Sequence, residues 1–153
     1  MVRLEWVALA QGYSVDRESN ALSIFNVIES LAVPKEVPDP PRGQQIPIGP
    51  QFVIVHRWIR SDPELGDRAV GRVKVVGPEG DTIGTAEFTV DLVAERRARS
   101  MLKFPFFPFA GIGEYKFFTE MKIGDDWQKI DEIALVVQRV ASEGTPAAPI
   151  QDL

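Results

Sequence analysis

Short apolar stretches with the periodicity of β-strands recur along almost the whole chain, and this feature most restricts the fold. Clusters of Gly, Pro, Asp and Asn, which favour turns, separate these stretches. No long segment repeats its apolar residues with the period of a helix, and only Ala94–Ser100 has the composition of a short helical turn. The sequence therefore predicts an all-β domain, and more specifically a two-sheet antiparallel β-sandwich of about seven to eight strands.

Each apolar stretch predicts one strand or one arm of a hairpin. In the first strand, Leu4, Trp6, Ala8 and Ala10 share one face, and Val7 and Leu9 share the other. Two stretches are apolar on both faces and are expected to be central strands. The turn Gly77–Asp81 predicts a hairpin. The predicted strands cover residues 3–11, 21–33, 51–60, 69–76, 82–93, 113–123 and 127–140, with the second and third of these in the central positions and an interruption in the last near Asp131.

Residues 34–50 contain six of the twelve prolines in the chain. Proline lacks the N–H group that a sheet ladder requires, so this segment is expected to be a long loop. Loops of this length either connect two sheets or carry function. We favour the connecting role.

Size and composition indicate one domain at residues 1–140, followed by a disordered tail at Ala141–Leu153. The formal charge of -5 opposes a nucleic-acid partner unless a local basic patch reverses it. Cysteine is absent, which removes disulfides and thiolate metal sites. No secretion signal and no membrane-spanning apolar run are visible, so a cytoplasmic location is expected.

The order of these features resembles a family of short, uncharacterised bacterial proteins. In that family an apolar strand leads through a polar turn into a second apolar strand and a proline-bearing connection, followed by a further apolar strand, a Gly-Pro-Glu-Gly hairpin, a Gly-x-Tyr-x-Phe strand and an apolar last strand. The family's first strand often ends in Cys-Asp, where this chain has Ala10 and Gln11. The resemblance implies a β-sandwich and supplies no activity or site. The matching segments are Leu4–Gln11, Leu22–Val33, Pro34, Phe52–Ile59, Gly77–Gly80, Gly113–Phe117 and Ile133–Val140.

No catalytic set is recognisable in the sequence. His56 is the only histidine, and its position in strand phase with Phe52, Ile54 and Trp58 favours a hydrogen-bonded structural residue over a catalytic or metal-binding one. Common hydrolase and nucleotide-binding motifs are missing, and no cofactor motif is seen. A non-enzymatic role is therefore favoured.

Two groups of acidic residues leave alternatives open. Asp62, Glu64 and Asp67 form one group, and Asp125, Asp126 and Asp131 form the other. Either group could contribute to a calcium site on a surface-binding sandwich, or to the carboxylate pair of a glycoside hydrolase. We favour ordinary solvated turns, because carboxylates in turns bond to nearby backbone groups.

The segment Phe104-Pro105-Phe106-Phe107-Pro108-Phe109 is the most unusual in the chain, and Arg96, Arg97, Arg99 and Lys103 precede it. Four phenylalanine rings carry more apolar area than one loop can cover by itself. The segment either packs into its own core or forms a contact. We predict a partner contact at Phe104, Phe106, Phe107 and Phe109, with self-association as the simplest form. The sequence as a whole thus indicates a binding or assembly module.

Overall fold

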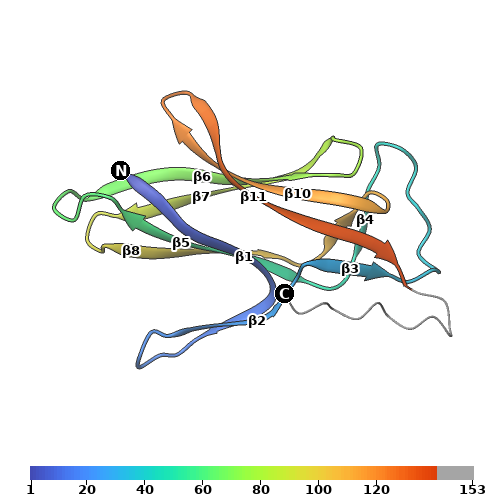
Figure 1. Cartoon of the computed structure of the whole chain (residues 1–153), viewed down its shortest axis with the longest axis horizontal. Coiled ribbons are helices and arrows are strands. Elements are labelled where there is room, and N and C mark those ends of the chain that lie inside the picture. Colours follow the sequence, from blue (N-terminus) through green and yellow to red (C-terminus); the bar gives the residue numbers. More distant parts are fainter. Residues whose placement is uncertain (141–153) are drawn as a thin grey trace, which may run out of the picture.

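The computed structural model describes residues 1–140, which form eleven strands and no helix (Figure 1). The predicted all-β class is confirmed. No helix among these residues is long and apolar enough to cross a membrane. The predicted disordered tail at Ala141–Leu153 lies outside the described residues.

Sheet A has four strands in the order β2-β1-β5-β8. All of its pairings are antiparallel. β5 is central and almost entirely buried, as predicted, because both of its faces are apolar. The bounds are β1 Val2–Val15, β2 Leu22–Val27, β5 Phe52–Arg60 and β8 Arg97–Phe104.

Sheet B has five strands in the order β3-β11-β10-β6-β7. The predicted hairpin between β6 and β7 is present, and Gly80 occupies its turn with a φ of 87°. β3 pairs with β11 in parallel, so the prediction of purely antiparallel sheets is wrong at this edge. The bounds are β3 Ser30–Val33, β6 Asp67–Val76, β7 Thr82–Leu92, β10 Gly113–Ile123 and β11 Asp126–Arg139.

Two short strands inside proline-containing segments pair with each other. β4 (Ile46–Ile48) lies in the proline-rich segment and β9 (Phe107–Phe109) lies in the phenylalanine segment. Pro47 is directly opposite Pro108. In an antiparallel pair every second position exchanges no hydrogen bonds, so two prolines can face each other at such a position. A central proline therefore does not prevent this ladder.

The main core lies between sheets A and B. It contains buried side chains from β1 and β5 of sheet A and from β6, β10 and β11 of sheet B, closed at one end by β9. A second cluster surrounds Trp58. A third, around Ala10, Val53 and Val55, lies on the other face of sheet A, where residues of the β1–β2 hairpin cover it.

The number of strands is larger than the seven or eight predicted. Residues 21–33 form two strands rather than one, because Asn26 adopts a φ of 53° and the chain then passes from sheet A to sheet B. Consequently β2 and β3 are edge strands, not the predicted central strand. The predicted helical turn at 94–100 is also wrong. Arg97–Ser100 belongs to β8, because pairing with β5 outweighs a weak helix propensity.

The loop at 34–45 connects β3 of sheet B to β4, and β4 leads on to β5 of sheet A, which agrees with the predicted crossing role. Arg139 at the end of β11 holds this loop. One of its guanidinium nitrogens donates to the carbonyl oxygens of Pro34 and Val37, and another bonds to Asp39 Oδ1 at 2.6 Å.

A candidate binding groove on sheet A

The phenylalanine segment is mainly core. Phe107 and Phe109 are 2% and 0% exposed, and Phe104 stacks on Phe52 with ring centroids 4.7 Å apart. Phe106 is 58% exposed. Both buried rings pack into the main core from β9, which pairs with β4. They are therefore poorly placed for the predicted partner contact, and a contact at Phe104 and Phe106 stays a prediction.

His56 is fully buried, as its strand phase suggested. Its Nε2 lies 2.9 Å from Thr119 Oγ1, and its Nδ1 lies 3.1 Å from Ser100 Oγ, which also accepts from Trp58 Nε1. Burial lowers the pKa of His56 to about 4. Such an imidazole is a weak base, and both of its nitrogens already bond to hydroxyl groups, so the arrangement fits a structural link between the sheets.

Neither acidic group collects into a metal site in residues 1–140, which hold no cluster of three or more His, Cys, Asp or Glu side chains suited to a metal. Asp62 accepts the backbone N–H of Glu64, and Asp131 accepts that of Glu132. Asp67 pairs with the N-terminal amine at 3.2 Å. These bonds are those expected of carboxylates in turns and at strand ends.

The most distinctive surface is a groove beside β8 of about 560 Å³, which we call the arginine groove. Four arginines lie along it: Arg57 of β5, Arg97 and Arg99 of β8, and Arg96 just before β8. Arg57 is directly opposite Arg99 in the register of the two strands. The remaining lining residues are Val15, Asn20, Glu95, Ala98 and Met101.

The arginines come together because of strand periodicity. Arg97 and Arg99 are two residues apart on β8 and so project from the same face. Ala98 and Leu102 have the opposite phase on β8, and they pack into the Trp58 cluster and the main core, respectively. Arg97 and Arg99 therefore project from the outer face of sheet A. The register then adds Arg57 from the neighbouring strand.

A β-bulge in β1 places one carboxylate beside this group. The register with β5 shifts between Leu4 and Trp6, which leaves Glu5 as the extra residue opposite Arg57. One Glu5 oxygen lies 3.0 Å from Arg57 Nε and 3.5 Å from Arg97 Nε. In the described part of the chain, neither Arg96 nor Arg99 has a carboxylate partner within 4.0 Å.

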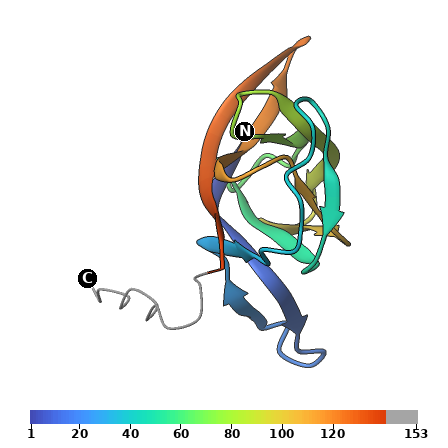
Figure 2. The ribbon, with the colours of Figure 1, turned by 90° about the vertical axis from the view of Figure 1, so that its right-hand side faces the viewer.

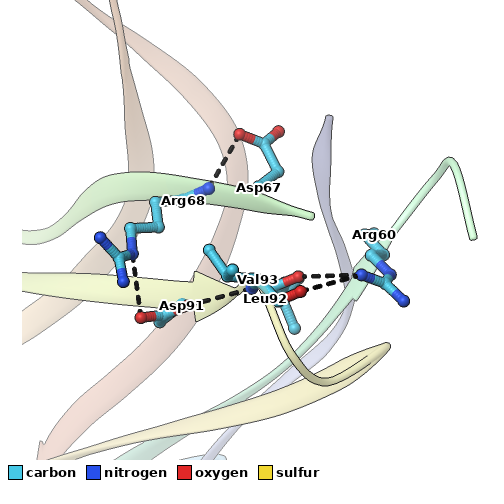
Figure 3. A network of polar contacts seen from close by, with 6 residues as sticks. All are labelled: Arg60, Asp67, Arg68, Asp91, Leu92 and Val93. Carbon is cyan, nitrogen blue, oxygen red and sulfur yellow. Dashed lines mark hydrogen bonds and ion pairs between the residues drawn. The ribbon is translucent and has the colours of Figure 1, made fainter. Parts of the chain in front are cut away.

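A polar network fixes the segment that carries Arg96 (Figure 3). Arg60 at the end of β5 donates to the carbonyl oxygens of Leu92 and Val93, each at 3.3 Å, and its backbone N–H donates to the carbonyl of Arg96 at 3.1 Å. Asp91 accepts the N–H of Val93 and pairs with Arg68. The connection from β7 to β8 is therefore held at both ends.

The opposite wall of the groove is the turn of the β1–β2 hairpin. Asp16 Oδ1 accepts the N–H groups of Glu18 and Ser19, which lowers the pKa of Asp16. Asn20 adopts a φ of 57°, and its carbonyl accepts from Arg99 Nη2 at 2.7 Å. This bond spans the groove and joins its two walls.

The groove is suited to binding an anion. Four arginines and one glutamate, Glu95, line it, and Glu5 pairs with two of these arginines, in a chain whose net charge is -5. Guanidinium groups bind carboxylates or phosphates through paired hydrogen bonds. A second hollow of about 590 Å³ continues along β8 and shares Val15, and in it Lys103 lies 5.3 Å from the ring of Tyr13.

A separate pocket of about 550 Å³ lies at one end of the molecule. The proline-rich loop, the β6–β7 turn and residues 110–112 form it. The Tyr115 hydroxyl donates to the Gly111 carbonyl at 2.6 Å and accepts from the Ala110 N–H, and burial raises the pKa of this tyrosine. The charged lining residues are three acidic ones, Asp39, Glu79 and Asp81, and one basic one, Arg42, beside polar and apolar side chains.

The proline-rich wall of that pocket depends on Arg139. Replacing Arg139 with Gln is expected to lower the free energy of unfolding by about 1–3 kcal/mol, because bonds from a charged group to two carbonyls and one carboxylate are lost. Hydrogen exchange measured by mass spectrometry should show faster exchange at residues 35–39. Arg42→Gln, in the same loop, serves as the control, and equal exchange in the two variants would contradict the role of Arg139.

Sequence reasoning noted Arg96, Arg97, Arg99 and Lys103 only as a basic run before the phenylalanines. It missed Arg57 and Glu5, because their positions depend on the register of β5 and on the bulge of β1. The alternation of Arg97, Arg99 and Lys103 is the signal in the sequence that could have identified one side of the groove.

No protein-family model matches the chain, and no curated protein matches it significantly. The resemblance to a bacterial family therefore stays a prediction.

Proposed function

We propose that this chain is a non-enzymatic binding module that holds a short acidic segment of a partner protein in the arginine groove. The observation that carries the proposal is the concentration of four arginines around one hollow in an otherwise acidic chain. Alternating acidic residues on an extended segment could reach Arg97 and Arg99, which β8 spaces by about 7 Å.

The groove fits an acidic peptide better than a nucleic acid. Nucleic-acid binding draws its affinity from many phosphate contacts, and here the surrounding negative charge would repel a long polyanion. A short segment needs only the groove itself. Bidentate pairing of arginine with carboxylate supplies specificity as well as affinity.

Sheets A and B pack around one core, which supports a rigid scaffold for such a site. We also propose that the domain is a two-sheet sandwich. A cytoplasmic location likewise stays a prediction.

The test is fluorescence anisotropy with a labelled glutamate-rich peptide on the full chain. Arg96→Gln with Arg97→Gln should weaken binding at least about 10-fold, because two charge-assisted contacts are lost. Arg42→Gln with Lys116→Gln is the control, since it removes the same charge away from the groove. Binding should also weaken as salt rises from about 0.05 M to about 0.5 M.

Two further probes distinguish the ligand classes. A labelled single-stranded oligonucleotide that binds more tightly than the peptide at physiological salt would overturn the acidic-peptide assignment. Equal losses in the groove variant and the control variant would show that the groove is not the site.

A further inference from the structure

The two sheets leave four edge strands, and their charges differ. β8 carries Arg97, Arg99 and Lys103, and β7 carries Glu87 and Asp91. Pairing either edge with its own copy would bring like charges together. β3 has only four residues and ends in the fully buried Val33. These are the usual ways in which proteins protect a sheet edge.

β2 lacks this protection. Its six residues, Leu22–Val27, include no charged side chain and no proline. Asn26 has a φ of 53° and interrupts the regular pairing with β1 after Phe25, and the pairing resumes at Val27, opposite Ala10. The hairpin that carries β2 lies at the periphery of the molecule in both views (Figures 1 and 2), so another chain can reach this edge.

Apolar side chains are exposed at the same edge. Phe25 is 50% exposed and Val27 is 60% exposed. The ring of Phe25 lies next to Gly12 of β1, about 4.0 Å from the point that a Cβ would occupy there. The opposite face of β2 is used differently, since Leu22 and Ile24 pack on the cluster around Ala10, Val53 and Val55.

We propose that β2 is a self-association surface, at which it pairs antiparallel with β2 of a second copy about a two-fold axis through Ile24. Residues opposite each other must point to the same face, so Ile24 meets Ile24 of the second copy and Phe25 meets Ser23. The two Phe25 rings then lie diagonally on one face and cover each other. Sheet A becomes continuous across the dimer.

The second copy fits this edge for an electrostatic reason. A neutral strand meets an identical neutral strand without repulsion, whereas the β7 and β8 edges would oppose like charges. The symmetry also closes, because each β2 edge is used once and no β2 edge remains free for a third copy. Asn26 limits the pairing to a few residues, so the dimer is weak and depends on concentration.

The experiment is sedimentation analysis of the full chain from about 1 µM to about 1 mM, a range that covers weak dimers. The mass is expected to rise from one copy to two. Phe25→Lys should weaken association at least about 10-fold, because it places a charge on the edge. Phe106→Lys is the matched control, since Phe106 is 58% exposed on another surface.

Circular dichroism and the melting temperature of each variant show whether it has folded, and Ser23→Lys is a second edge variant if Phe25→Lys unfolds the chain. The natural chain has no cysteine, so a spin label at Ser23→Cys reports the distance between the two β2 strands. We expect a short distance between the two labels of the dimer when they are at Ser23→Cys. Labels at Thr89→Cys of β7 should show no such short distance.

A single copy at every concentration would overturn the proposal. Loss of the dimer in Phe106→Lys but not in Phe25→Lys would also overturn it and move the contact to the phenylalanine segment. These outcomes are independent of the proposed function, because the variants that test the arginine groove leave the sequence of β2 unchanged.

Discussion

Replacing Phe109 with alanine is expected to lower the free energy of unfolding by about 3–5 kcal/mol, because the ring is fully buried and its loss leaves a cavity. Phe109 belongs to the main core and lies opposite Ile46 of β4. The same change at Phe106 should alter the free energy by no more than about 0.5 kcal/mol, since that ring is 58% exposed.

Urea unfolding of both variants measures this difference directly. The two residues are three positions apart and chemically identical, so each is a control for the other. Similar losses in the two variants would mean that the phenylalanine segment packs differently from the arrangement described above.

The protein is also expected to lose stability as the pH falls from about 6.5 to about 4, because His56 must stay neutral in the folded state. The pKa of His56 is lowered by burial from 6.5 to about 4 in the folded chain, whereas the unfolded chain keeps the ordinary value. Between these values the unfolded state binds the additional proton. The contribution of neutral His56 to the free energy of unfolding is therefore fully present above about pH 6.5, and about 3 kcal/mol of it is lost at pH 4.

The comparison that isolates this effect is His56→Gln. The variant is less stable at neutral pH, because it loses stacking on Trp58 and Phe88. Its stability should, however, fall less steeply with pH than that of the natural chain, since the carboxylates contribute equally to both. Parallel curves from urea unfolding between about pH 7 and about pH 4 would show that His56 is not responsible.

The sequence predicted best where local chemistry decides the structure. The β6–β7 hairpin follows from Gly77–Asp81 between two alternating strands, and β5 follows from an apolar run with few polar positions. The interruption predicted near Asp131 is not a break, since β11 is continuous, but the register with β10 shifts there, between Thr119 and Glu120 of the partner strand. In these cases turn residues and periodicity agree.

It predicted least well where one residue changes the phase of a strand. The bulge at Glu5 moves Leu4 to the inner face, together with Val7 and Leu9, and leaves Trp6 on the outer face with Ala10. Strict alternation places Leu4 and Trp6 on one face. Alternation with the inward-facing Tyr115 and Phe117 likewise predicts that Glu120 lies outside, but Glu120 is 6% exposed and pairs with Arg72 and Lys74.

The pairing of β3 with β11 has a consequence for synthesis on the ribosome. Val136 pairs with Ser30, and the Arg139 that holds Pro34 is 105 residues further along the chain. The strands of sheet A are all complete at Phe104, but β10 and β11, which cover part of their inner face, follow only at Gly113–Arg139 and are still to emerge from the ribosome. The nascent chain thus carries an uncovered apolar face and an unanchored proline-rich loop until its last strands emerge, and chaperones that bind such faces would act during that interval.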